Sequence, residues 1–562
     1  LKEKEAIILG AEKRAVEMEY SLFCQIRDQV GKTAARVLAT AAAVAELDVL
    51  ASFAESASRY GYTRPLVDDG TLLHIRNGRH PVVERLGTEP FVPNDVLMDE
   101  QENRLLVITG PNMSGKCLRS DTLLPTDRGL LPIVDLQPAH ARVGEFTPIE
   151  CMVQAPSGRR KATHFYHGGR QSTVKVTTRL GYQIEGTAEH RVWVRGSDEK
   201  EGWKRLGDIL PGDVVAIQRG AQLWGSEIEL EAPSAEAVRC VCRDRLPRTL
   251  DADLAYMMGL LVGDGTLTDR EAFALSTADE FIASEFRRIV DRLFGCHVCV
   301  QANGKEYAVC CKQVRLYLAD LGLGYGRAWE KHVPGTILRA PREVVIAFLQ
   351  GLFDTDGFVE NRYGNVRLAT SSPRLAREVQ LLLLNLGIIA SLHTQQTARR
   401  PSHLVSINGA DAIAFHREVG FRLPRKQVRS QLASTIRMPN VGGIPHLNGT
   451  LKRIQERIVA TRNKPVALKK NKSVNSIFYT YLPLGRNVSH AKLAELIEYC
   501  QECGVPCPEL DAVRGSGYFY DRVTAIEAGE AEVCDLSVEE EHAYVAGGFV
   551  SHNSTYLRQV AL

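Results

Sequence analysis

A phosphate-binding motif that stops halfway constrains this 562-residue chain more than any other feature. The apolar run 105–109 predicts a buried strand, and a G-x-x-x-x-G-K sequence follows it. In such loops backbone N–H groups hold phosphate oxygens, the lysine reaches the outer oxygens, and a Ser or Thr must come next to ligate Mg²⁺. Cys117 stands in that place. The residues of the half motif are Gly110, Pro111, Asn112, Met113, Ser114, Gly115 and Lys116.

The missing half of the motif lies at the other end of the chain. Ser554 and Thr555 open a helical pattern there, so deleting residues 117–553 would restore a complete strand–loop–helix phosphate site. An insertion that removes itself needs reactive groups at both junctions. Cys117 can attack the Lys116 carbonyl to give a thioester, and the Ser554 hydroxyl can take over the acyl group.

The downstream junction carries the remaining chemistry. The Asn553 side-chain amide can cyclise and cleave its own backbone, and His552 can act as acid and base. The chain here resembles an intein, a self-splicing insertion, in four blocks: residues 117–122, the T-x-x-H of residues 187–190, residues 534–544 and residues 548–553. The resemblance implies that Thr187 polarises the scissile amide and His190 assists the first acyl shift, while Asp535 and His542 coordinate the two cleavages.

Alternating patterns in the flanks favour β structure. Residues 173–184 alternate about a Leu180-Gly181 turn, and residues 538–550 are rich in β-formers. A closed β fold would bring both ends of the insertion together. The resemblance therefore implies a β-rich, horseshoe-like splicing domain that is split around a second domain.

The middle of the insertion contains two related segments, residues 257–265 and 349–357. Each carries small residues four positions apart and ends in Asp-Gly, which predicts two closely packed helices with Asp264 and Asp356 side by side. Paired carboxylates can hold a divalent metal and an activated water.

These two segments resemble the LAGLIDADG homing endonucleases, although Val262 replaces the usual acid at the sixth motif position. The resemblance implies an α/β, Mg²⁺-dependent nuclease for double-stranded DNA, with Asp264 and Asp356 as metal ligands and Lys331 as a catalytic lysine. Residues 370–372 and a helix at 382–388 also fit it. An endonuclease relic that has lost cleavage is the alternative.

A strongly basic segment follows, although the whole chain carries a net charge of only +2. Residues 421–475 contain a single acid, Glu456, and we expect them to contact the DNA backbone; a solvated basic face is the alternative. The basic residues are Arg422, Arg425, Lys426, Arg429, Arg437, Lys452, Arg453, Arg457, Arg462, Lys464, Lys469, Lys470 and Lys472.

The sequence outside the insertion resembles the MutS family of DNA mismatch-repair ATPases. Residues 78–84, 91–95 and 108–113 carry the likeness, and residues 554–559 continue it. The resemblance implies ATP binding after splicing, with Phe91 near the adenine, Ser554 and Thr555 completing the loop, and Ser554 on Mg²⁺. A full-length host of this family would bind mismatched DNA as a homodimer, whereas this fragment alone is expected neither to hydrolyse ATP nor to recognise mismatches.

Composition excludes several classes. Hydrophobic residues make up 44% and charged residues 24%, as in ordinary globular proteins. Thirteen cysteines form neither a disulfide framework nor a clean zinc pattern, and no membrane span is expected, since the best apolar run, residues 381–392, is short. The start at Leu1, with no signal segment, indicates a cytoplasmic protein fragment.

We expect a mixed, multidomain fold, and three hypotheses remain: a splicing intein with an endonuclease in a MutS fragment, a DNA-binding ATPase fragment with an inert insertion, or an endonuclease with impaired splicing. The expected domains are a helical end of the lever region (1–60), the start of an α/β ATPase (61–116), the splicing domain (117–245 and 516–553), the endonuclease (246–420), the basic extension (421–515) and the rest of the phosphate loop (554–562).

Overall fold

The computed structural model describes residues 2–82, 84, 93–101, 103–104, 116–230, 246–267, 271–324, 327–361, 364–397, 400–433, 443–461 and 472–553. Phe91, residues 110–115, Ser554 and Thr555 lie outside this part, so their predicted roles have no structural account. Two compact units divide the chain at residue 110. The first contains a long helix, α1 (Lys2–Tyr60), and an antiparallel pair of strands, β1 (Leu73–Gly78) and β2 (Asn94–Met98).

Helix α1 ends where the sequence predicts, at Tyr60, because Gly61 takes a positive φ of 64°. Apolar residues recur along α1 in steps of three and four, a spacing that predicts a buried stripe, but this prediction is wrong for the described structure. Phe23, Val30 and Leu47 are 62%, 61% and 67% exposed, since no other described helix of this unit packs against α1. By length and composition α1 could also cross a membrane, which the sequence analysis did not anticipate. A core helix of a soluble protein passes the same test.

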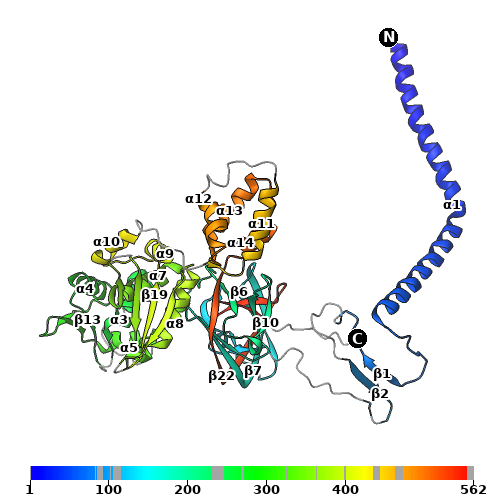
Figure 1. The fold of residues 1–562 in the computed structure, drawn as a ribbon. Helices are drawn as coiled ribbons and strands as arrows, with labels where there is room; N and C mark the ends of the chain where they lie inside the picture. The colour runs from blue at the N-terminus through cyan, green and yellow to red at the C-terminus, as the bar shows by residue number, and fades with distance from the viewer. Residues whose placement is uncertain are drawn as a thin grey trace. The chain divides into compact units, whose positions relative to one another are not determined.

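The second unit begins with a β-rich part built on a 12-stranded sheet in the described residues, with the order β10-β9-β24-β11-β22-β3-β8-β7-β6-β4-β5 and β23 beside β24. Two 21-residue strands, β7 and β22, pair antiparallel along most of their length (Figure 1). The predicted hairpin about Gly181 joins β7 to β8 and is confirmed, with a φ of 84° at that glycine. The strands are β3 (Leu118–Arg119), β4 (Leu123–Thr126), β5 (Gly129–Pro132), β6 (Phe146–Ala155), β7 (Gly158–Thr178), β8 (Gln183–Gly186), β9 (Arg191–Arg195), β10 (Glu201–Arg205), β11 (Val214–Gln218), β22 (Tyr518–Val538), β23 (Ala543–Ala546) and β24 (Phe549–His552), with short 3-10 turns at Ile133–Leu136 and Leu206–Asp208.

The α/β part between residues 252 and 418 repeats one motif twice: helix, two strands, helix, two strands, helix. The strand orders β12-β13-β15-β14 and β16-β17-β19-β18 show the same topology in both halves. The first half has α3 (Ala252–Asp264), β12 (Gly265–Thr266), β13 (Phe273–Ser276), α4 (Glu280–Phe294), β14 (Cys299–Val300), β15 (Glu306–Val309) and α5 (Lys312–Asp320). A 3-10 turn (Ala328–Glu330) and α6 (Gly335–Leu338) lead to the second half: α7 (Arg342–Thr355), β16 (Gly357–Val359), β17 (Val366–Thr370), α8 (Pro373–Asn385), β18 (Ser391–Gln395), β19 (Ser402–Ile407) and α9 (Ala410–Glu418).

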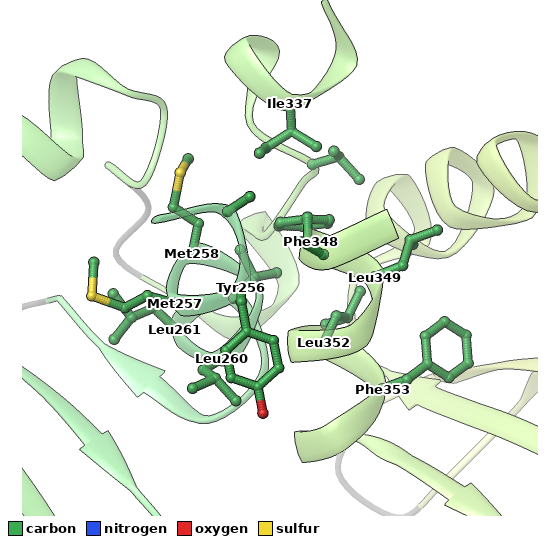
Figure 2. Close-up of a cluster of buried hydrophobic side chains, with 14 of the residues drawn as sticks. Tyr256, Met257, Met258, Leu260, Leu261, Ile337, Phe348, Leu349, Leu352 and Phe353 are labelled. Atoms are coloured by element: carbon green, nitrogen blue, oxygen red, sulfur yellow. The ribbon is translucent and has the colours of Figure 1, made fainter. Parts of the chain in front are cut away.

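Helices α3 and α7 pack against each other through the small residues that the sequence singled out. A Cβ on Gly259 would lie 2.2 Å from the Phe348 carbonyl oxygen, and one on Gly351 would lie 2.1 Å from that of Tyr256. In Figure 2, apolar side chains of both helices surround this contact. The backbones therefore approach as closely as glycine allows, as predicted. The predicted helix at 382–388 is correct only up to Asn385, where α8 ends; α8 begins earlier than predicted, after the cap at Ser372.

A helical extension completes the second unit. Its helices are α11 (Asn448–Ala460), α12 (Lys472–Ser476), α13 (His490–Glu502) and α14 (Pro508–Ser516), with a π-helical turn at Ile477–Tyr481 and a strand pair β20 (Gly443–Ile444) and β21 (Val488–Ser489). Helix α10 (Pro424–Ala433) packs instead against α9 and β16 of the α/β part. Its core includes Cys500, Cys503 and Cys507 and extends onto Tyr518 and Tyr520 of β22. These thiols are core side chains, and the described residues contain no group of three or more His, Cys, Asp or Glu arranged for a metal.

Candidate functional site: two junctions and an acidic pair

The upstream junction is buried and hydrogen-bonded to the T-x-x-H segment. Cys117 is fully buried at the start of β3, which lies between β8 and β22. Its backbone N–H, which belongs to the Lys116–Cys117 peptide bond, donates to Thr187 Oγ1 at 3.0 Å. Thr187 N and Oγ1 in turn donate to the Cys117 carbonyl at 2.9 and 3.3 Å. Thr187 therefore fixes the amide nitrogen that an acyl shift must release.

His190 lies three residues further on and is fully buried. Burial lowers its pKa to about 3, and the charge of His552 lowers it further, while the Lys116 backbone acts in the opposite direction. Neither ring nitrogen makes a hydrogen bond of ordinary geometry with a described residue. His190 is therefore a neutral imidazole beside the Lys116 backbone, able to accept a proton.

The Cys117 thiol is held in its protonated form. Burial raises its pKa far above the ordinary value, and the neighbouring Asp535 and Cys534 raise it further. Asp535 is itself fully buried and accepts hydrogen bonds from Tyr544 Oη at 2.6 Å and Leu536 N at 2.8 Å. The sequence did not reveal Tyr544 as the partner that orients this carboxylate.

The downstream junction closes strand β24. Asn553 is fully buried; its Nδ2 donates to the Val538 carbonyl at 3.2 Å and its N–H to that of His542 at 3.0 Å. The His552 Nδ1 lies 2.8 Å from the Asn553 carbonyl oxygen, the carbonyl that cyclisation would attack. Burial lowers the His552 pKa to about 4.

Trp203, which the sequence analysis missed, contacts His552. The two ring centroids lie 4.9 Å apart in an edge-to-face arrangement. Trp203 lies on β10, beside Trp193 of β9. The side chain of His542 is exposed, although its charge lowers the His552 pKa. Its carbonyl, rather than its ring, contacts Asn553.

The two junctions share one neighbourhood. The Lys116 charge lowers the pKa of both His190 and His552. Strand β24 pairs with β9 through Ser551 and Val192, two residues after His190. Residues far apart in the chain are thus brought together, as the β fold was expected to do.

The acidic pair lies where α3 and α7 end. Burial raises the pKa of the Asp264 carboxyl. Burial and the charge of Asp264 together raise the pKa of the Asp356 carboxyl to about 6. The Lys331 ammonium acts in the opposite direction on both and donates to the Gly263 carbonyl. The three predicted residues therefore interact electrostatically.

Lys426 is a further residue of this site that the sequence placed only in the basic segment. Its buried ammonium donates to the carbonyls of Phe353 at 2.8 Å and Asp354 at 2.7 Å, and also to that of Gly357. Burial lowers its pKa to about 8, with the acids Asp354, Asp356 and Asp264 acting against this. Lys426 thus satisfies carbonyls at the end of α7 and adds positive charge beside the acidic pair.

The residues at this site fit a divalent cation. Two carboxylates whose charged forms are disfavoured by burial gain most from a nearby dication, and hard oxygen donors are the ligands that Mg²⁺ prefers. Asp264 and Asp356 are the residues that would hold it.

Within the described residues, four arginines of the basic extension form ion pairs. Arg422 pairs with Asp253 at 3.3 Å, Arg425 with Asp279 at 2.8 Å, Arg453 with Glu199 at 3.4 Å and Arg457 with Glu509 at 3.2 Å. These side chains tie the extension to neighbouring elements. Fewer basic groups are thus available for DNA than the sequence count suggests.

Comparison with known proteins gives matches to separate segments. Residues 343–420 match the family described as a LAGLIDADG-like domain. The replicative DNA helicase DnaB of Rhodothermus marinus is 29% identical over 78% of this chain and 46% of its own length. The DNA mismatch repair protein MutS of Symbiobacterium thermophilum is 56% identical over 117 residues, which are 21% of this chain and 13% of that protein. The chain therefore spans less than half the length of these relatives.

Two kinds of solved structure are also similar. The homing endonuclease I-DmoI in complex with DNA and Mn is 20% identical, with a TM-score of 0.25, over 30% of this chain and 96% of its own. A variant of the Ssp DnaB mini-intein is 23% identical, with a TM-score of 0.15, over 18% of this chain and 63% of its own.

Proposed function

We propose that this chain, which fits a fragment of MutS carrying an intein with a LAGLIDADG domain, is a self-splicing precursor: residues 117–553 excise themselves and join Lys116 to Ser554. The observation that carries the proposal is the burial of both junctions in one neighbourhood, where Thr187, His190 and His552 surround the two peptide bonds that must break. The similarity to the DnaB relative covers most of this chain. It therefore includes much of the insertion, because the segments outside the insertion are only a small part of the chain.

The upstream chemistry follows from the contacts of Cys117. As Sγ attacks the Lys116 carbonyl carbon, the imidazole of His190 relays the thiol proton to the Cys117 nitrogen in the same step in which the C–N bond breaks. Thr187 Oγ1 holds that nitrogen in place. Burial, and after it the charge of Asp535, raises the pKa of the thiol and so keeps it protonated before this step.

The downstream chemistry follows from the contacts of Asn553. Ser554 Oγ attacks the thioester and releases the Cys117 thiol. The Asn553 Nδ2 then attacks its own carbonyl carbon and gives up one proton, while the Ser554 nitrogen leaves and gains one. His552, whose Nδ1 lies 2.8 Å from that carbonyl oxygen, relays the proton between the two nitrogens. The ester between Lys116 and Ser554 rearranges to an amide. The joined chain has the complete phosphate loop.

Expression of the chain tests the splicing proposal. We expect the 62.2 kDa precursor to give way to an excised product and a joined host on a denaturing gel. Cys117→Ala should block both, and Asn553→Ala should stop the reaction at the branched ester. A precursor that persists with both junctions intact would contradict the proposal and favour an inert insertion.

A second function is supported by the acidic pair at the crossing helices. We propose that the part from residue 246 to 420 cleaves double-stranded DNA with Mg²⁺ on Asp264 and Asp356, a cation that would activate the attacking water. Lys331 and Lys426 balance the two carboxylates. In the splicing-blocked Cys117→Ala chain, Asp264→Asn should abolish cleavage of a DNA carrying the uninterrupted host sequence, and EDTA should do the same. Neither change should slow splicing in the chain with Cys117. Splicing without any cutting would identify an endonuclease relic.

The function of the host segments on either side of the insertion is supported by sequence similarity alone. We propose that joining restores ATP and Mg²⁺ binding by Lys116, Ser554 and Thr555 in a cytoplasmic protein whose full-length form is a homodimer on mismatched DNA. The similarity to MutS relatives over 117 residues supports this. The predicted domain boundaries stand as proposals, with residues 421–515 as an extension that contacts DNA through its unpaired basic groups.

A further inference from the structure

A cleft of about 280 Å³ lies where the β-rich part meets the second half of the α/β part. Its basic lining residues come from both parts: Arg179 follows β7, Arg377 belongs to α8, and His393 and His403 belong to β18 and β19. Threonine hydroxyls add to the polar lining, among them Thr178 and Thr394. No role assigned above uses these residues.

Hydrogen bonds between the two parts fix the walls of this cleft. Leu392 N donates to the Leu180 carbonyl at 2.8 Å, and Gln380 Nε2 donates to the same oxygen at 2.9 Å. Gly181 has a φ of 84°, and a Cβ there would lie 2.4 Å from the Leu392 carbonyl oxygen. The turn of one part is thus locked against the edge strand of the other, so the cleft is a built feature.

The charge in this cleft is positive and incompletely neutralised. None of the described residues that line it is acidic. Arg179 has a partner outside the lining, Asp521, at 3.6 Å, whereas Arg377 makes no ion pair within the described residues. Burial lowers the pKa of Arg377, and the charge of Arg119 also lowers it, while the charges of Asp121 and Glu185 act in the opposite direction. Burial and the charge of Arg377 lower the pKa of His403.

A tetrahedral oxyanion matches these donors. Guanidinium groups bind phosphate oxygens with paired N–H bonds, and hydroxyls donate to the remaining oxygens. The start of α8 at Pro373 also lines the cleft, and the dipole of this 13-residue helix adds partial positive charge there. We propose that this cleft binds a phosphate group, supplied either by the backbone of bound DNA or by free phosphate.

Titration with inorganic phosphate tests the site. The protein is the full chain carrying Cys117→Ala and Asn553→Ala, and calorimetry is run at constant ionic strength. Because a hydrogen bond to a charged group is lost, Arg377→Gln should weaken phosphate binding roughly tenfold. Thr394→Val should weaken it about threefold through loss of a neutral donor. The matched control is Arg170→Gln, which removes the same charge from β7 where the arginine pairs with Glu530. It should leave phosphate affinity unchanged.

Duplex DNA of unrelated sequence, bound without metal, separates the two sources of phosphate. If the ligand is a backbone phosphate, Arg377→Gln reduces the salt dependence of DNA affinity by about one contact. If the ligand is free phosphate, only the calorimetric affinity falls. The DNA arm rests on the proposed endonuclease function and the phosphate arm does not, so their failures are distinguishable. The proposal is overturned if neither phosphate affinity nor the DNA salt dependence responds to Arg377→Gln or Thr394→Val.

Discussion

Thr187 touches the residue whose peptide bond must break, through three hydrogen bonds at the upstream junction. Thr187→Val keeps the shape but removes the hydroxyl, so the Cys117 N–H loses its acceptor. We expect thiol-induced cleavage at this junction to slow by about tenfold, the effect of one hydrogen bond to a reacting group. Thr187→Ser, which keeps the hydroxyl, should retain most of the rate; equal loss in both variants would assign Thr187 a packing role only.

Trp203 should act on the downstream step alone, because its ring contacts His552 and not Cys117. Trp203→Ala frees the imidazole to turn away from the Asn553 carbonyl, and we expect the branched ester to accumulate. Trp203→Phe, which keeps an aromatic edge, should restore Asn553 cyclisation in part. The measurement is the ratio of downstream to upstream cleavage on gels. A parallel fall of both rates would indicate a folding defect instead.

His190 links the site to stability in acid. Its folded pKa, about 3, lies below the ordinary value of 6.5, so the unfolded chain binds the proton more tightly. The neutral buried ring therefore makes its full contribution to the free energy of unfolding above pH 6.5. This contribution is lost as the pH falls from there toward 3. Urea unfolding of the splicing-blocked chain should show this loss. His190→Gln should show a smaller loss over the same range, and an identical pH profile would mean that His190 is not buried as a neutral ring.

The sequence alone singles out the residues that we propose to react, because the proposed splicing chemistry requires them beside the two junctions. It could not predict Trp203, Tyr544 or Lys426, because their roles arise from contacts between distant strands and helices. A buried lysine inside a basic run gives no signal of its own. The contacts of Lys426 appear only once α10 packs beside the end of α7.

Helices α3 and α7 approach each other at glycines that leave no room for a side chain. Gly351→Ala places a methyl group 2.1 Å from the Tyr256 carbonyl oxygen, where backbone must move to accept it. We expect a loss of about 2 kcal/mol or more in the unfolding transition of this core, as for other overpacked sites. Gly515→Ala in α14 is the control, since a Cβ there meets no atom within 4 Å. It should leave stability unchanged or raise it by up to about 1 kcal/mol.

The positions of α3 and α7 could be predicted from small residues four positions apart and from the Asp-Gly pair at the end of each segment, and the structure confirms both helices. The hairpin at Gly181 followed from alternation and turn chemistry. The stripe on α1 has helical spacing, but spacing cannot tell whether a partner for it lies within the chain. The doubled order of the two four-stranded sheets was also beyond reach, because those strands are only two to six residues long.

The whole molecule consists of two units that divide before the upstream junction. All the described contacts of Cys117 and Asn553 cited above come from residues 116–553. We therefore expect replacement of residues 2–104 by an unrelated soluble domain to leave the splicing rate within about threefold, as for sites that share no partners. Gel analysis of the fusion measures this rate. A loss of splicing would show that the first unit takes part in positioning the junction.

The pairing of β3 with β22 determines how early the proposed splicing reaction can begin during synthesis of the chain. Leu118 pairs with Cys534, so the pocket around Cys117 cannot close until the ribosome has made nearly the whole insertion. At about 5 to 20 residues per second, the intervening segment of about 400 residues takes about 20 to 80 s to make. During that interval Asp535 and strand β22, which complete the upstream site, have not yet been synthesised. If the chain splices as proposed, the upstream peptide bond stays intact until the downstream junction is close to being synthesised.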